Sequence, residues 1–146
     1  MVNLSKLSEN LNELMNERGM NQSDLAEAMN TCSSKFSSYL TGKRAPNYHT
    51  FLSLLEFFHC SADFLLGLTE YPCEDVCYKP VQPFGERMRA ILRETNMTQY
   101  AFAKQSNISW GVFYHWLVGK SFPSVNNLVK IAAFFDCSVD FLLGRV

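Results

Sequence analysis

An internal repeat constrains this chain more than any other feature of its sequence. Shifting the sequence by 77 positions aligns residues 7–68 with residues 84–145 without a gap. Identical residues recur along the alignment, and both copies close on Asp-Phe-Leu-Leu-Gly. Solenoid units run to roughly 20–50 residues, so a repeat of this length indicates tandem domains instead. We therefore expect one domain at residues 1–68 and a second at residues 84–146.

Residues 69–83 separate the two copies. This segment contains Pro72, Pro80 and Pro83 and has no sustained hydrophobic periodicity. Such a composition is typical of a semi-extended linker. At ~3.3–3.6 Å per residue, the linker spans at most about 50 Å.

Apolar spacing within each copy predicts helices and no strands. In the first copy, Leu7, Leu11 and Leu14 recur at helical spacing, and Gly19 suits the end of that helix. A short helix is also expected over residues 33–40. The same pattern along both copies predicts an all-α fold of two tandem five-helix domains.

Capping residues mark where the later helices of the first copy begin. Asn21, with Asp24 three residues further on, has the spacing of a capping box. Asn47 and Ser61 are favourable N-caps for two further helices. Asn30 lies where the chain must turn sharply, and Asn tolerates the left-handed conformation better than most residues.

Charge is distributed unevenly between the two copies. The whole chain carries 13 Lys and Arg against 14 Asp and Glu, and a net charge of −1 by itself favours no polyanionic partner. Residues 7–68 hold four basic against seven acidic residues, whereas residues 84–145 hold seven against four. The second copy, at +3 rather than −3, is therefore the better attractor of phosphates. Its Arg87, Arg89 and Arg93 are interpreted as a solvated helix face.

The five cysteines are expected to be free thiols. An odd count in a chain without a recognisable signal peptide favours reduced cysteines and a cytoplasmic location. Cys73 and Cys77 are interpreted as unreactive linker thiols, because no histidine flanks them to complete a zinc site. Cys60 and Cys137 occupy equivalent apolar positions and are expected to be small buried hydrophobic residues. No stretch of the sequence is apolar enough for a membrane span.

No catalytic constellation is visible in the sequence. The three histidines, His49, His59 and His115, have no Ser, Cys or carboxylate at nucleophile–base spacing. A glycine-rich phosphate loop is also missing. We therefore expect that the chain is not an enzyme and that it uses no cofactor, bound metal or small-molecule substrate.

Both copies resemble one known family. In the first copy the resemblance rests on the run from Met20 to Asn30, the segment 31–39 and the loop Thr41-Gly42-Lys43-Arg44-Ala45-Pro46. In the second copy it rests on Met97-Thr98-Gln99, Ala103, Asn107, Phe113, Leu117, Gly119-Lys120 and Pro123. These residues resemble the Cro and phage-repressor class of helix-turn-helix DNA-binding proteins, also called the xenobiotic-response-element class. The resemblance implies two lambda-repressor-like DNA-binding domains in a transcriptional regulator.

Several positions of the motif also have physical reasons. Ala26 and Ala103 supply the small residue that is needed where the two helices of the motif approach each other. Gln22 and Gln99 begin helices, where free backbone N–H groups and a side-chain amide can hold a phosphate. Trp116 is expected to pack in the core of its domain.

The resemblance places the second helix of each motif in the major groove of duplex DNA, with its N-terminal residues at base edges. For the first copy it implies base contacts by Ser33, Ser34, Lys35 and Ser38, and phosphate contacts by Lys43 and Arg44. For the second copy the corresponding candidates are Trp110, Val112, His115 and Lys120. A Trp followed by Gly at a helix start is unusual for base readout. We therefore expect the first copy to supply modest specificity and the second to supply electrostatic affinity.

Two hypotheses about function follow. In the first, the tandem domains form a covalent pseudo-dimer that binds an asymmetric operator in double-stranded DNA and represses transcription. In the alternative, the second copy has lost DNA readout and is a protein-interaction module. Trp110, Tyr114 and His115 would then contact a partner protein or a second copy of the chain in a homodimer.

Overall fold

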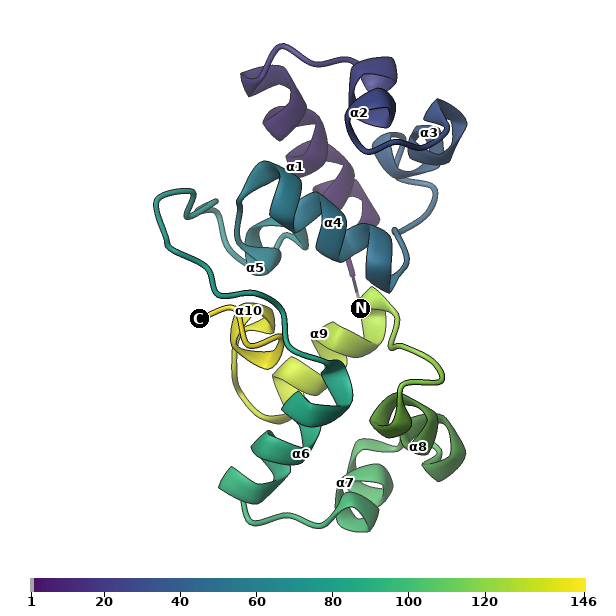
Figure 1. Cartoon of the computed structure of the whole chain (residues 1–146), viewed down its shortest axis with the longest axis vertical. Helices are drawn as coiled ribbons and strands as arrows, with labels where there is room; N and C mark the ends of the chain where they lie inside the picture. The colour runs from purple at the N-terminus through teal and green to yellow at the C-terminus, as the bar shows by residue number, and fades with distance from the viewer. Residues whose placement is uncertain (1) are drawn as a thin grey trace. The chain divides into compact units, whose positions relative to one another are not determined.

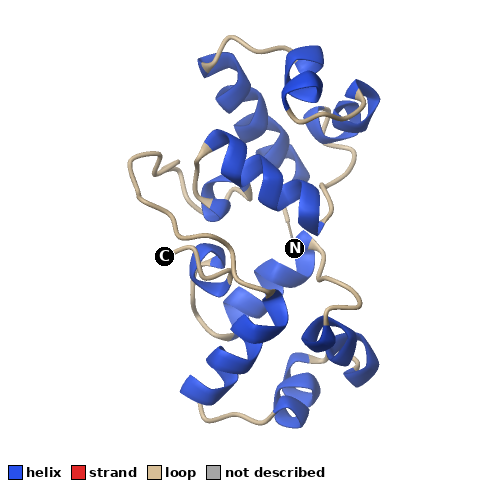
Figure 2. Ribbon diagram, viewed as in Figure 1, coloured by secondary structure: helices blue, strands red, loops and turns tan. Residues whose placement is uncertain are grey.

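The computed structural model describes residues 2–146 of the chain. Ten helices and no strands occur in this range (Figure 1, Figure 2). The chain divides into two compact units, Met1–Val76 and Cys77–Val146, and each unit contains five helices. The prediction of an all-helical fold is therefore confirmed for the described residues.

Unit 1 is built on its first and longest helix. Its helices are α1 (Leu4–Glu17), α2 (Gln22–Ala28), α3 (Ser33–Leu40), α4 (Tyr48–Phe58) and α5 (Ala62–Leu65). Helix α1 packs against α3 and α5, and α2 packs against α3. The apolar face predicted for α1 is the buried one, because Leu7, Leu11, Leu14 and Met15 are all buried. Fully burying a side chain of this size stabilises the fold by roughly 1.5–3 kcal/mol.

Local capping determines where the helices of unit 1 begin. The side chain of Asn21 accepts the Asp24 backbone N–H at 2.8 Å, and the Asp24 carboxylate accepts the Asn21 backbone N–H at 3.0 Å. Asn47 and Ser61 cap α4 and α5 in the same way with their side-chain oxygens. Asn30 has a φ of 54°, in the left-handed region. The predicted capping box, the two predicted N-caps and the predicted turn at Asn30 are therefore confirmed.

Unit 2 repeats this order of helices. Its helices are α6 (Phe84–Glu94), α7 (Gln99–Ser106), α8 (Trp110–Val118), α9 (Val125–Phe134) and α10 (Val139–Leu142). Helix α6 packs against α7 and α8, α7 against α8, and α9 against α10. The core of the unit is aromatic: Phe102 contacts Phe113 with ring centroids 4.9 Å apart and stacks on Phe135 at 5.3 Å. Trp116 is buried as predicted and packs edge to face on Phe84.

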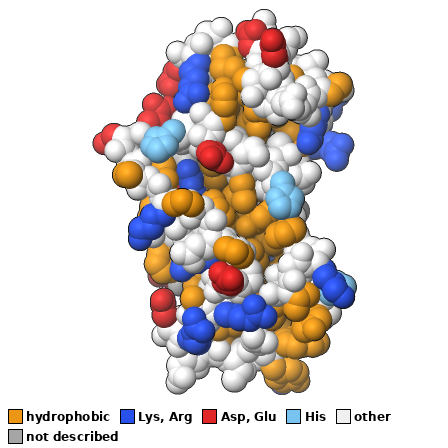
Figure 3. Space-filling model, viewed as in Figure 1, with side chains coloured by type: hydrophobic (Ala, Val, Ile, Leu, Met, Phe, Trp, Pro, Cys, Tyr) orange, Lys and Arg blue, Asp and Glu red, His pale blue; other side chains and the backbone are white. Residues whose placement is uncertain are grey.

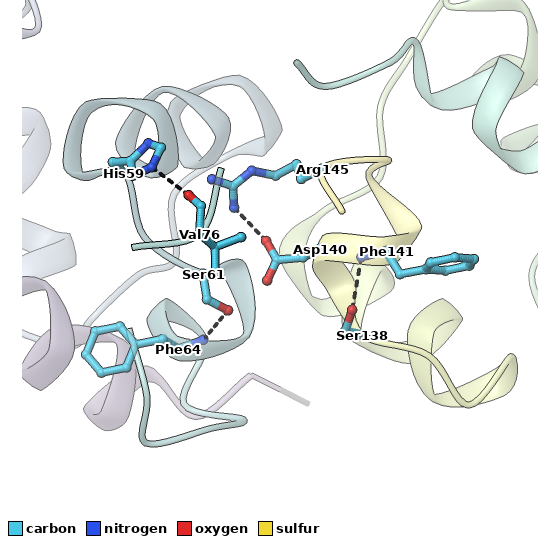
Figure 4. A network of polar contacts seen from close by, with 8 residues as sticks. All are labelled: His59, Ser61, Phe64, Val76, Ser138, Asp140, Phe141 and Arg145. Carbon is cyan, nitrogen blue, oxygen red and sulfur yellow. Dashed lines mark hydrogen bonds and ion pairs between the residues drawn. The ribbon is translucent and has the colours of Figure 1, made fainter. Parts of the chain in front are cut away.

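The segment between the last helix of unit 1 and the first helix of unit 2 is hydrogen-bonded at several points. The Pro72 carbonyl oxygen accepts the Ser61 N–H at 2.8 Å within unit 1. Within unit 2, the Lys79 N–H donates to the Arg145 carbonyl oxygen at 2.7 Å. The Arg145 guanidinium is buried and lies over the Tyr78 ring. It pairs with Asp140 at 2.6 Å (Figure 4). Both ends of the predicted linker are therefore attached to their own unit.

The two equivalent cysteines differ in burial. Cys60 is fully buried as predicted, but Cys137 is only half-buried, so the prediction for Cys137 is wrong. In unit 1, the returning segment at Pro72 is bonded to Ser61, directly beside Cys60. Ser138 has no equivalent backbone bond within the described part of unit 2.

Candidate nucleic-acid interface

Helix α3 presents a polar edge to solvent. Phe36 and Tyr39 turn into the core of unit 1 and contact each other edge to face at 5.8 Å. Burial of these two rings fixes the rotation of the helix about its axis. On the opposite side, Ser34 and Lys35 are exposed, whereas Ser33 and Ser38 are half-buried. The predicted base-reading residues of the first copy therefore lie on one helix, and Ser34 and Lys35 are the most accessible of them.

The basic loop after α3 is fastened to that helix. The backbone N–H groups of Lys43 and Arg44 both donate to the carbonyl oxygen of Ser38, at 2.9 and 3.2 Å. Gly42, with a φ of 76°, makes the left-handed turn that brings the loop back. Both cationic side chains are exposed. The structure thus brings the predicted phosphate-binding residues next to the predicted base-reading helix.

The side chain of Gln22 has a partner within unit 1. Its side-chain Nε2 donates to the carbonyl oxygen of Ser33 at 2.6 Å and so joins the first residue of α2 to the first residue of α3. The bond uses one of the two N–H groups of the amide, so the predicted phosphate contact of Gln22 stays a prediction. Gln22 therefore ties α2 to α3, and the small residue Ala26 of α2 is buried. Gln99 begins α7 at the equivalent place in unit 2 and is half-buried.

Helix α3 is also held at its C-terminal end by α1. Ser8 Oγ and Asn12 Nδ2 both donate to the Leu40 carbonyl oxygen, at 2.5 and 3.1 Å. A carbonyl at a helix C-terminus has no partner within the helix, so these bonds satisfy it. Neither donor was predicted from the sequence, because a donor on α1 and an acceptor about thirty residues away give no local signal.

Helix α8 occupies the place of α3 in unit 2, but its exposed face is apolar. Ser109 caps the helix by accepting the Val112 N–H, and Phe113, Trp116 and Leu117 turn inward. The predicted contact residues Trp110, Val112, His115 and Lys120 are all exposed. Tyr114 is exposed beside Trp110, with ring centroids 6.3 Å apart.

Two arginines that were interpreted as a solvated face have backbone partners. Arg89 Nη1 donates to the Leu117 carbonyl oxygen at 3.1 Å, at the end of α8. Arg87 donates to the carbonyl oxygens of Phe141 and Leu142 in α10. The interpretation is therefore wrong for Arg87, which is half-buried, whereas Arg89 is exposed as interpreted. Both guanidinium groups bind carbonyls at helix C-termini, where cations are favoured. Arg89 and Arg87 align in the repeat with Asn12 and Asn10 of α1, which make equivalent bonds in unit 1.

Cys32 immediately precedes α3 and has an unusual thiol. A hydrogen bond with the Ser34 hydroxyl, at 3.0 Å, and backbone N–H groups of Ser34 and Lys35 lower the pKa of Cys32 below its ordinary value. These donors stabilise the thiolate, which is the charged form. The side chain is exposed, so the thiolate is accessible to reagents.

Two further findings concern metal sites and membrane-spanning helices. Within residues 2–146, no three His, Cys, Asp or Glu side chains are grouped so that they could hold a metal ion. Every helix in the same range is too short or too polar to cross a bilayer.

The pairs α2–α3 and α7–α8 each consist of two short helices joined by a tight turn, with a buried alanine between them. In α7–α8 this arrangement is that of a helix-turn-helix. Residues 87–146 match the family described as the Cro/C1-type HTH DNA-binding domain. They therefore form one Cro/C1-type domain of the kind found in DNA-binding transcription regulators. No curated protein and no solved structure matches the chain.

Proposed function

We propose that this chain is a sequence-specific DNA-binding transcriptional repressor with two tandem helix-turn-helix domains. In this proposal the domains are residues 1–68 and 84–146, joined by residues 69–83. The match of residues 87–146 to a DNA-binding domain supports the assignment for the second copy. For the first copy the support comes from the repeat itself, since helices, caps and helix-end bonds recur in unit 1.

The observation that carries the proposal is the polar edge of α3 with its attached basic loop. Ser34 and Lys35 offer hydrogen-bonding groups to base edges, and serine hydroxyls bond to several bases. Lys43 and Arg44, held at the end of α3 by their backbone bonds to Ser38, are placed to neutralise phosphates. Half-buried Ser33 and Ser38 contribute less surface to such a contact.

Unit 2 would add affinity more than base recognition. Its repeat carries a net charge of +3, whereas the repeat in unit 1 carries −3. Lys120, His115 and the start of α7 at Gln99 are its polar candidates, and Trp110 and Val112 its apolar ones. Because the two reading helices differ, the preferred operator would be asymmetric.

Selection of binding sites from random duplex DNA tests this function. The full chain, immobilised through a tag, is expected to enrich an asymmetric site. Enrichment of a palindrome would contradict the tandem pseudo-dimer, and enrichment of no sequence would contradict sequence-specific binding. A variant with Lys35, Lys43 and Arg44 replaced by Ala is the matched control and is expected to lose the enrichment.

A second candidate function is favoured by one observation, the exposure of Trp110 and Tyr114 on α8. Exposed aromatic residues are enriched at protein interfaces. In this alternative, unit 2 joins two copies of the chain or binds another protein. Sedimentation equilibrium of the wild-type chain and of Trp110→Leu tests it: the alternative requires that the substitution reduces the oligomer mass.

A further inference from the structure

The α7–α8 face of unit 2 exposes several large aromatic side chains. Tyr100 on α7 is 69% exposed, and Trp110 and Tyr114 on α8 are 45% and 47% exposed. Figure 3 shows apolar side chains gathered over α8. Scattered single apolar residues are normal on a protein surface, but a group of them marks a binding surface. Tyr100 and Trp110 align with Ser23 and Ser33 of unit 1, so these aromatic side chains are specific to the second copy.

A shallow groove lies between α7 and the start of α8. Its volume is about 450 Å³, and its lining includes Tyr100, Lys104, Asn107 and Trp110. These side chains provide two aromatic rings, an ammonium group and an amide. An unpaired nucleotide has groups that match each of them: a base face stacks on a ring, a base edge bonds to an amide, and a phosphate is attracted to an ammonium group.

The charge around this groove favours a polyanion. No Asp or Glu occurs between Glu94 and Asp136, a stretch that includes all of α7 and α8. Lys104 and Lys120 are exposed in this stretch, and neither forms an ion pair with a described residue. In unit 1, by contrast, α2 carries Asp24 and Glu27. A neutral apolar partner would not require a surface so free of acidic groups.

The exposed chemistry of α8 fits single strands better than duplex. Reading a base pair in the major groove needs hydrogen-bonding side chains at base edges. Trp110, Val112 and Tyr114 provide few such groups and present apolar surface instead. In a duplex the base faces are covered by neighbouring bases, whereas in a single strand they are free to stack on aromatic rings.

We propose that the α7–α8 face of unit 2 binds single-stranded nucleic acid by stacking unpaired bases on Trp110 and Tyr100, with Lys104 at the phosphate backbone. The inference rests on the proposed function in one respect, that the chain is a nucleic-acid-binding protein. It adds the capture of an unpaired strand by unit 2 to the duplex binding proposed above.

Fluorescence anisotropy with a labelled 20-nucleotide oligothymidine tests the proposal on the full chain. Wild-type protein is expected to bind the oligonucleotide with an affinity that falls as salt rises. Trp110→Leu keeps apolar volume but removes the ring, and it is expected to weaken binding by about tenfold. Trp110→Phe, which keeps an aromatic face, is expected to retain most of the affinity. The matched control is Tyr71→Leu, which removes a ring that is exposed outside this face.

A second pair of variants tests the electrostatic part. Lys104→Gln is expected to weaken oligothymidine binding. It is also expected to reduce the slope of log affinity against log salt concentration by roughly one. Lys79→Gln removes the same charge from an exposed site of unit 2 outside α7 and α8 and is expected to have little effect. Thermal unfolding of each variant, followed by circular dichroism, checks that the fold is retained.

The outcomes separate this inference from the proposed function. Equal losses in Trp110→Leu and Tyr71→Leu would overturn the inference, as would a changed oligomer mass in Trp110→Leu with unchanged oligothymidine binding. If wild-type protein binds its selected duplex but not oligothymidine, the inference fails and the proposed function stands. If it binds oligothymidine but selects no duplex sequence, the inference stands and sequence-specific duplex recognition fails.

Discussion

Asn10 donates a hydrogen bond from its side-chain Nδ2 to the backbone carbonyl oxygen of Phe64, at 2.7 Å. The bond joins α1 to α5 across 54 residues of chain. Unit 2 has the same connection made by a different side chain, since Arg87 Nη2 donates to the Phe141 carbonyl oxygen at 2.6 Å. Both donors and both acceptors are related by the 77-residue shift of the repeat. The position of the bond is therefore kept between the copies although the donor residue has changed.

Replacing Asn10 by Ala should destabilise unit 1. Asn10 is buried, and the substitution removes its donor from the Phe64 carbonyl, which keeps the Gly67 N–H at 2.9 Å. We expect a loss of about 0.5–1.5 kcal/mol in the free energy of unfolding, measured by urea denaturation. Asn16→Ala, an exposed change on the same helix, is the control and should have little effect. Equal losses in the two variants would show that the bond contributes nothing specific.

The local features of the fold were predictable from sequence, and the bonds between distant segments were not. Asn21 and Asp24 are three residues apart, so the capping box follows from their spacing alone. Asn30 was predictable for the same reason, because its left-handed φ reflects a turn between neighbouring helices. The partner of Gln22 depends instead on how α2 meets α3, and no spacing rule predicts that its amide binds Ser33.

The helices that carry the candidate site were predictable from sequence, but the full set of side chains on its surface was not. The repeat and the family resemblance predict that α3 and α8 are exposed second helices of two such motifs. They did not identify Tyr100 or Lys104, since these residues belong to α7 and meet Trp110 only through the packing of α7 on α8. The signal that could have found them is the absence of Asp and Glu between Glu94 and Asp136.

Gly85 and Gly111 should respond in opposite ways to substitution by Ala. A Cβ at Gly85 would overlap the carbonyl oxygen of Leu117 and come within 2.9 Å of its carbonyl carbon, both rigid backbone atoms. We expect Gly85→Ala to destabilise the protein by about 1–3 kcal/mol through overpacking. Gly111 lies within α8 and has open space around its Cβ position, so Gly111→Ala should stabilise by about 0.5–1 kcal/mol. Thermal unfolding measures the stability of both variants. A stabilising effect of Gly85→Ala would contradict the prediction, because it would show that α6 and α8 can move apart at little cost.

The reactivity of Cys32 should depend on pH in a way set by Ser34. Hydrogen bonds from Ser34 lower the pKa of Cys32, so its thiolate forms at a lower pH than in an ordinary cysteine. The thiolate is the reactive form, and the alkylation rate should therefore rise with pH through this lowered pKa. Ser34→Ala removes the largest cause and should move the midpoint to higher pH. Iodoacetamide labelling, quantified by mass spectrometry of the Cys32 peptide, measures the midpoint; an unchanged midpoint in Ser34→Ala would contradict the assigned cause.

Lys35 and Lys43 should affect duplex binding differently. Lys43 lies in the loop after α3, where we propose a phosphate contact, so Lys43→Ala should weaken selected and shuffled duplexes alike and reduce the salt slope by roughly one. Lys35 lies on the exposed edge of α3, and Lys35→Ala should weaken the selected duplex more than the shuffled one. Lys6→Gln, which removes an exposed charge from α1, is the control for net charge. Anisotropy titrations at three salt concentrations measure all four proteins, including wild type. If Lys35→Ala weakens both duplexes equally, Lys35 is a phosphate contact and α3 does not read bases through it.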